Sequence, residues 1–241
     1  MIEQVFETGL KVVENIRDTQ SGEIKKAADL VAEAFLNQHK FFVTGSGHSH
    51  TVSEEFYGRA GGLAFTVPIL TTELTLNEHP TKSGSIERLP GYAKILIDLY
   101  DVSKDDVLLV ASNSGRNAYP IEMALEAHKK GAKVIAITSI KHSKSTTARH
   151  VSGKHLMDIA DVVIDNCGEA GDSCIKLEGL TSTMCPTSSM ANSFIAQAIS
   201  VECASVILKA GVVPPVFQSL NIEGTEDINK EYFEKYTRLY K

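Results

Sequence analysis

The chain has 241 residues, 43% hydrophobic side chains and a formal net charge of -6. This apolar content is enough for a sizeable core, and the negative charge disfavours non-specific binding to nucleic acid, which depends on basic residues. Length and composition together indicate one α/β domain with additional helices.

Cysteine usage and hydropathy point to a cytoplasmic protein. The cysteines at positions 167, 174, 185 and 203 have spacings that fit neither a zinc site nor a redox pair, so we expect reduced thiols. No uninterrupted apolar segment approaches the ~20 residues of a membrane span. The first residues, with Glu3 and Glu7, lack the pattern of a signal peptide. We therefore expect no membrane partner.

In chain order, the first half alternates helices and strands. Apolar residues at helical spacing predict two amphipathic helices, 2–18 and 21–38, the second capped by Ser21. A strand over 40–45, a helix over 49–60 that ends at Gly61-Gly62, and a strand over 63–70 follow. Residues 71–90 are polar and irregular, which is typical of a functional or mobile loop.

The second half continues the alternation. It contains predicted helices over 91–100, 117–130 and 187–210, and predicted strands over 107–112, 133–138 and 161–165. The tail is charged, with a helix expected around Ile228 to Leu239. We expect one domain overall: N-terminal helices (1–38) that pack on their own sheet or on a partner subunit, a ligand-binding domain (39–215) and a charged tail (216–241).

This alternation predicts a three-layer αβα sandwich around a parallel sheet, with Rossmann-like or flavodoxin-like topology. The carboxyl ends of parallel strands meet at one edge of the sheet, where ligands bind. Three hydroxyl-rich segments leave strands at that edge: Gly45–Ser49, Ser112–Asn117 and Thr138-Ser139. The sequence therefore predicts a ligand site there.

The Gly45–Ser49 turn is not a nucleotide motif. The dinucleotide fingerprint needs a third glycine where this chain has His50, and no Gly-Lys-Ser/Thr of a P-loop occurs. The missing fingerprint therefore argues against a nicotinamide-dependent dehydrogenase. The Gly-Ser-Gly sequence is either a structural turn or part of an anion site.

Ser112–Gly115 is a more specific signal. Three hydrogen-bonding side chains in succession, followed by Asn117, stand where a strand enters a helix, and helix N-terminal N–H groups attract anions. The alternative is a helix cap. Arg116 adds a charged contact or lines the rim. The hydroxyls of Thr187 and Ser188, at the start of the last long helix, are likewise caps or ligand contacts.

These segments resemble the sugar isomerase (SIS) domain, over roughly residues 35–210. Ser114–Pro120 is similar to the corresponding stretch of N-acetylmuramic acid 6-phosphate etherases, and Gly45–Glu55 to that of phosphoheptose isomerases. Overall the chain looks most like a group of SIS proteins labelled as phosphosugar isomerases. The resemblance implies a five-stranded parallel sheet, homodimers or homotetramers, and a phosphosugar ligand. The substrate-binding residues it suggests are Gly45, Ser46, Gly47, His48, Ser49, Arg59, Ser112, Asn113, Ser114, Gly115, Asn117, Ser139, Thr187 and Ser188.

The catalytic carboxylate is where the chain departs from these families. Their usual carboxylate position after the first turn holds Arg59 here, and Glu55 lies four residues earlier. The two are either a surface ion pair, or a base (Glu55) and the group that orients it. The etherases carry a second glutamate before the third strand, and Glu87, near His79, falls in that stretch.

Histidines raise the question of a metal. His50 and Glu54 have i,i+4 spacing and His48 is adjacent, but we predict neither a metal nor another cofactor. His48 or His79 would instead shuttle protons. The basic segment around Lys141 and Arg149 is expected to be a solvated loop, with the rim of the phosphate site as the alternative.

The sequence thus predicts a phosphosugar-binding protein with Glu55, Glu87 and His79 as catalytic residues. The first hypothesis is an aldose–ketose isomerase that transfers a proton between C1 and C2. The alternatives are a sugar 6-phosphate deglycase or etherase, and a phosphosugar sensor without turnover.

Overall fold

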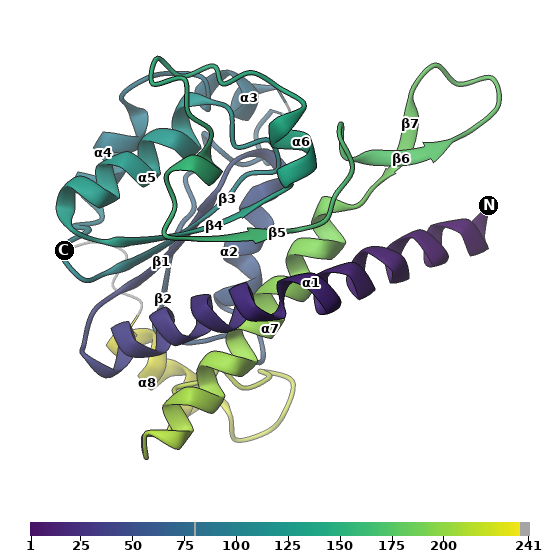
Figure 1. Cartoon of the computed structure of the whole chain (residues 1–241). Helices are drawn as coiled ribbons and strands as arrows, with labels where there is room; N and C mark the ends of the chain where they lie inside the picture. Colours follow the sequence, from purple (N-terminus) through teal and green to yellow (C-terminus); the bar gives the residue numbers. More distant parts are fainter. Residues whose placement is uncertain (80, 237–241) are drawn as a thin grey trace.

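Five parallel strands run through the centre of the molecule in the order β2-β1-β3-β4-β5 (Figure 1). The structure is a computed structural model that describes residues 1–79 and 81–236. β1 and β3 are buried along their whole length, because helices cover both faces of the sheet. The strands are β1 (Phe41–Gly45), β2 (Thr66–Ile69), β3 (Val107–Ala111), β4 (Lys133–Thr138) and β5 (Val162–Asp165).

Alternate side chains of each strand enter two separate cores. Phe41 and Val43 contribute to the core beneath α1 (Ile2–Leu36), α2 (Thr51–Phe56) and α7 (Ser188–Lys209). Phe42, between them, contributes to the core beneath α4 (Tyr92–Leu99) and α5 (Ala118–Lys130). This alternation confirms the predicted three-layer sandwich and its five-stranded parallel sheet.

The first helix is continuous, so the prediction of two helices is wrong. Ser21 does not cap a second helix: its hydroxyl donates to the carbonyl of Arg17, and the hydroxyl of Thr19 donates to that of Asn15. Hydroxyls that bond one turn back are compatible with a helix interior. The buried stripe continues across this point from Ile16 to Ile24, where α1 packs on α7.

An arm extends away from the sheet at one end of the molecule (Figure 1). It consists of the N-terminal half of α1 and a hairpin of β6 (Ser173–Lys176) and β7 (Thr183–Pro186), which the sequence analysis missed. These strands have four residues each, and Ile175 is their one fully buried residue, so they carry no long apolar run. Ile2, 77% exposed, and Phe6, 68% exposed, leave an apolar surface on α1.

The helix predicted over 49–60 is shorter than expected. A 3-10 turn over Gly47–His50 leads into α2, which ends at Phe56 because Tyr57 is extended. The chain then folds back so closely that a side chain on Gly62 would overlap the carbonyl of Phe56. Arg59 therefore lies beyond the helix. β2 is also shorter than the predicted strand, since Leu63 pairs with Val216 instead.

The segment predicted to be irregular contains a short helix, α3 (Lys82–Ile86). Two further elements were not predicted: α6 (Ile140–Lys144) and a 3-10 turn over Leu156–Asp158. The helices and strands predicted between 91 and 138, and the long helix α7, begin and end within one or two residues of their expected positions. The tail helix is α8 (Glu226–Tyr236), and Leu239 lies outside the described residues.

By length and composition alone, α7 would be long and apolar enough to cross a membrane. No such segment was expected from the sequence. In the fold α7 packs on α1 and α2, and one side of it is in the core. The core helix of a globular protein meets the same criterion, so this is weak evidence for a membrane span.

Candidate functional site

The turn after β3 is held by a hydrogen bond within the turn and by another to a distant segment. The hydroxyl of Ser112 accepts the N–H of Gly115 at 3.2 Å, and the Gly115 carbonyl accepts the N–H of Leu156 at 2.8 Å. Gly115 has a φ of 57°, a conformation that favours glycine. Among the described residues, none forms a hydrogen bond with the half-buried hydroxyl of Ser114. That hydroxyl is therefore available to an anion, together with the N–H of Ala118 at the start of α5 (Ala118–Lys130), which has no hydrogen-bond partner among the described residues.

Glu87, directly after α3, connects two distant segments at this edge, the end of β1 and the start of α5. Its Oε2 accepts a hydrogen bond from the hydroxyl of Ser46, at the end of β1. Its Oε1 accepts one from Nδ2 of Asn117 at 2.5 Å, and its carbonyl accepts the N–H of Tyr119 at 2.9 Å. The half-buried carboxylate of Glu87 thus lies between the two hydroxyl-rich turns that the sequence analysis singled out.

The basic loop after α6 reaches the same place. Nη1 of Arg149 donates to Oδ1 of Asn117 at 3.1 Å, and the N–H of Arg149 donates to the carbonyl of Arg116 at 2.8 Å. Arg149 is exposed, as expected of a solvated loop. Its side chain nevertheless fixes the orientation of the Asn117 amide, so the loop also forms the rim of the site.

Glu55 belongs to a second group, between α2 and α7. Its carboxylate accepts hydrogen bonds from Nε2 of Gln197 at 2.8 Å and from the hydroxyl of Ser193 at 3.3 Å, and it forms an ion pair with Arg59. The predicted ion pair therefore exists, but it is not a simple surface pair: the Glu55 side chain is only 20% exposed. Two donors from α7 hold this carboxylate in place.

The structure does not bring all the predicted catalytic residues together. Among the described residues, Glu55 and Glu87 share no hydrogen-bond partner. His79 is exposed, and within the described part of the chain its ring bonds only to Thr81, at 3.0 Å. His48 is also exposed. The first turn itself is tight, since a side chain on Gly45 would overlap Ser49.

Two predicted ligand contacts are engaged in internal bonds. Nδ2 of Asn166 donates to Oδ1 of Asn113 and to Oδ1 of Asn192, each at 3.0 Å. The hydroxyl of Ser139 donates to the carbonyl of Gly168 at 2.6 Å. Asn113 and Ser139 therefore stabilise the junction of β3, β4 and β5 with α7, and their side chains are less free to meet a ligand than Ser114.

The N-terminus of α7 already holds a carboxylate from the chain itself. Oδ1 of Asp172 accepts the N–H groups of Thr187 and Ser188 at 3.1 and 2.9 Å, and its Oδ2 accepts the hydroxyl of Ser188 at 2.7 Å. This is the position that an anion would occupy at a helix N-terminus. The geometry favours the cap interpretation of Thr187 and Ser188 over the ligand interpretation.

The histidines after β1 do not form a metal cluster in this arrangement. Nε2 of His50 lies 3.2 Å from Oε1 of Glu54, and its Nδ1 lies 2.5 Å from the carbonyl oxygen of Gly47. No group of three or more histidine, cysteine, aspartate or glutamate side chains suited to a metal occurs among residues 1–79 and 81–236.

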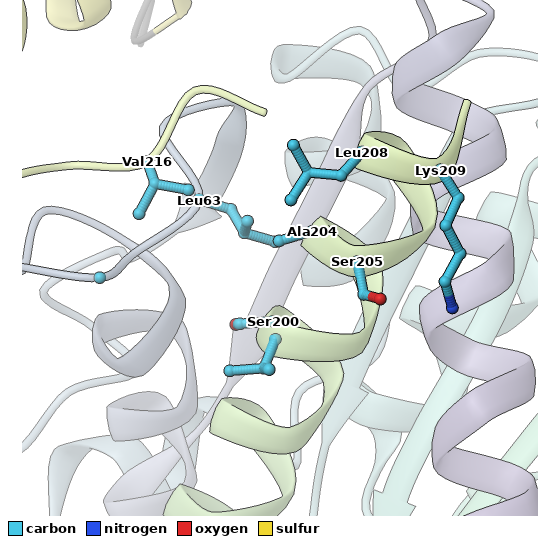
Figure 2. Close-up of a pocket in the computed structure, with 9 residues that line it drawn as sticks. Leu63, Ser200, Ala204, Ser205, Leu208, Lys209 and Val216 are labelled. Carbon is cyan, nitrogen blue, oxygen red and sulfur yellow. The ribbon is translucent and has the colours of Figure 1, made fainter. Parts of the chain in front are cut away.

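A separate apolar groove of about 670 Å³ runs along α7 (Figure 2). Leu63 and Val216 face Ala204 and Leu208 across it, and among the described residues that line it Lys209 is the one with a charged side chain. Its described lining contains no carboxylate or histidine, so it lacks an acid–base pair. It is therefore not part of the candidate site, which remains the Ser46–Glu87–Asn117 junction and the turn after β3.

Sequence reasoning missed several residues that shape these groups. Ser193 and Gln197 are four residues apart on α7, a spacing that marks one helix face and that could have paired them with Glu55. Asp172 and Asn166 lie in segments without regular spacing. For these two residues no local sequence signal was available, since their partners come from other parts of the chain.

Comparison with known proteins agrees with the observed fold. The SIS domain family model matches residues 5–139. A UPF0309 protein of Halalkalibacterium halodurans is 44% identical over 228 residues, 95% of this chain and 94% of its own. One of Thermoanaerobacter pseudethanolicus is 43% identical over 245 residues, 100% of this chain and 99% of its own. The fold resembles a phosphoheptose isomerase of Neisseria gonorrhoeae (TM-score 0.57, 18% identity, 86% of this chain and 97% of that one).

Proposed function

This chain belongs to the SIS domain family, and we propose that it binds a phosphorylated sugar and moves a proton on the carbon beside the sugar carbonyl. The resemblance of its fold to phosphoheptose isomerases from Neisseria gonorrhoeae and Francisella tularensis supports the ligand class. The observation that carries the proposal is the carboxylate of Glu87, bonded to Ser46 and Asn117, one residue from each anion-binding turn.

The phosphate would bind at the turn after β3. Among the described residues, neither the hydroxyl of Ser114 nor the N–H of Ala118, the first residue of α5, has a hydrogen-bond partner, so both could donate to a phosphate. Ser112, Gly115 and Asn117 shape the turn, and the exposed His48 and half-buried Ser49 face the same edge from the end of β1. In this assignment four of the predicted contacts stabilise the fold around the site through internal hydrogen bonds and do not touch the ligand: Asn113, Ser139, Thr187 and Ser188.

Proton transfer needs a base near the carbonyl end of the sugar. A carboxylate takes the proton from C2 of an aldose while O1 gains a proton, which gives the enediol. The carboxylic acid then returns its proton to C1 while O2 loses its proton, which gives the ketose. The sequence favours Glu55 as this base, with Glu87 as a helper. The geometry favours Glu87, since it contacts both turns, whereas Glu55 is neutralised by Arg59 and held by α7. We assign Glu87 as the base and Glu55 as the second carboxylate.

Hydrogen exchange tests the proposal without knowledge of the product. The protein is incubated with sugar phosphates in D₂O, and deuterium at C1 or C2 is followed by NMR. Isomerases and lyases that begin by proton abstraction both incorporate deuterium. Exchange in the wild type and its loss in Glu87→Gln support the proposal, whereas binding without exchange contradicts the enzyme assignment.

A phosphosugar sensor is the second candidate. The observation that favours it is the Arg59 guanidinium, which pairs with Glu55 at the position where related enzymes carry a carboxylate. A sensor binds sugar phosphates without exchanging their protons. The deuterium experiment therefore separates the two functions.

We further propose that the protein is a homodimer or homotetramer. Phe194, Val201 and Leu208 recur every seventh residue on α7, and they are 57%, 70% and 56% exposed. A stripe at this spacing follows one face of a helix, and it runs beside the apolar groove of Figure 2. A second copy of the chain, packed on this face, would cover it.

A further inference from the structure

Three arginines converge beside Glu87 and Asn117. Arg88 follows Glu87 in the chain, Arg116 precedes Asn117, and Arg149 bonds both the Asn117 side chain and the Arg116 backbone. The three side chains are close enough for their charges to interact. Partial burial lowers the pKa of Arg116, and the positive charges of Arg149 and Arg88 lower it further. These side chains form what we call the arginine cluster.

The arginine cluster has no acidic partner in the described part of the chain. Arg17 and Arg59 each form an ion pair with a carboxylate, but Arg88, Arg116 and Arg149 form none. Nε of Arg116 is buried, and no atom of the described residues forms a hydrogen bond with it. The neighbouring carboxylate, Glu87, is already bonded by Ser46 and Asn117. An unsatisfied buried donor among like charges is costly unless a ligand completes it.

We infer that the arginine cluster binds a second acidic group of the ligand, so that the substrate is a sugar phosphate that also carries a carboxylate or a second phosphate. This inference rests on the proposed function. Planar guanidinium groups bind both kinds of anion through paired hydrogen bonds. The cluster begins at the residue after the Ser112–Gly115 turn, so one small molecule could bring a phosphate to the turn and its other anion to the arginines.

Titration calorimetry with matched ligand pairs tests this inference. Glucose 6-phosphate is compared with 6-phosphogluconate, and fructose 6-phosphate with fructose 1,6-bisphosphate. We expect the second anion to tighten binding to the wild type by about tenfold or more for one of these pairs, as for other hydrogen bonds to charged groups. Equal affinities within both pairs would overturn the inference.

Arginine variants locate the effect. Arg88→Met is the first choice, because this side chain is exposed and forms no hydrogen bond within the described residues, so the fold should persist. Arg116→Met is the second. Each should remove most of the gain from the second anion and leave the affinity for the monophosphate within about twofold. Lys144→Met is the control, since it removes one exposed positive charge from α6.

The outcomes separate this inference from the proposed function. If monophosphates bind and the second anion adds nothing, or its gain survives both arginine variants, only this inference fails. If the variants lower the affinity for the monophosphates as much as the affinity for the ligands with two acidic groups, the arginines bind the phosphate itself. The inference is then also wrong. If no sugar phosphate binds the folded wild type, the proposed function fails and the inference with it.

Discussion

Nδ2 of Asn117 donates a hydrogen bond of 2.5 Å to Oε1 of Glu87, and this contact fixes the carboxylate at the start of α5. Arg149 holds the other atom of the same amide, so the Asn117 side chain cannot flip without losing both bonds. The amide thereby aims its N–H group at the carboxylate. A carboxylate held in one orientation beside an anion-binding turn is what a positioned base requires.

Replacing Glu87 with glutamine should abolish proton exchange while sugar phosphates still bind. The amide cannot accept a proton at the pH of the reaction, and loss of a general base costs about 10²- to 10⁴-fold. Deuterium incorporation measures the rate, and calorimetry measures the affinity. Glu55→Gln is the matched variant, and we expect its exchange rate to fall less. A larger fall in the exchange rate for Glu55→Gln than for Glu87→Gln would identify Glu55 as the base.

Replacing Ser114 with alanine should weaken phosphate binding without destabilising the fold. Its hydroxyl has no hydrogen-bond partner among the described residues, so the free protein loses none. A hydrogen bond to a charged group contributes about 1.5–3 kcal/mol, so the dissociation constant should rise roughly tenfold or more. Unchanged affinity for every sugar phosphate that binds the wild type would show that the phosphate lies elsewhere.

Asp172 should stabilise the beginning of α7. Asp172→Ala removes the acceptor for two N–H groups and one hydroxyl, a loss comparable with that of a helix cap, about 0.5–2 kcal/mol. The melting temperature should fall by a few degrees. Glu178→Ala is the control, because Glu178 is exposed in the same hairpin. Equal melting temperatures for the two variants would argue against the cap.

The exposed stripe of α7 predicts self-association. Light scattering should give two or four times the 26.2 kDa of one chain, and Val201→Glu should shift the mass to that of the monomer. Val201 is 70% exposed in the single chain, so the variant should fold. Val151→Glu, at a 97% exposed position outside α7, should not change the mass. A monomeric wild type at micromolar concentration would refute the assembly.

The sequence predicted the sheet because its strands are unbroken apolar runs such as Val107–Ala111, which only a sheet covered on both faces can bury. The break in α1 was predicted wrongly, since Ser21 has the residue type of a cap but uses its hydroxyl within the helix. The β6–β7 hairpin was missed because its strands are short and, with Ile175 alone fully buried, lack an apolar pattern.

The turns of the candidate site could be predicted from the sequence, but the position of its carboxylate could not. The two turns stand out locally, because hydroxyls follow directly after apolar strands. The position of Glu87 does not, since its partners Ser46 and Asn117 come from segments 41 and 30 residues away. The contact between Gln197 and Glu55 spans 142 residues. Only the folded chain shows that these carboxylates belong to two separate groups.

A thermal-shift screen tests the central claim most directly. The protein is melted with a panel of sugar phosphates and with the corresponding sugars that lack phosphate. A ligand at 100 times its dissociation constant adds about 2.7 kcal/mol of stability, which gives a clear rise in melting temperature. We predict that one or a few sugar phosphates stabilise the protein and that the free sugars do not. No shift with any sugar phosphate would mean that the hydroxyl-rich turns are caps alone, and it would contradict the proposed function.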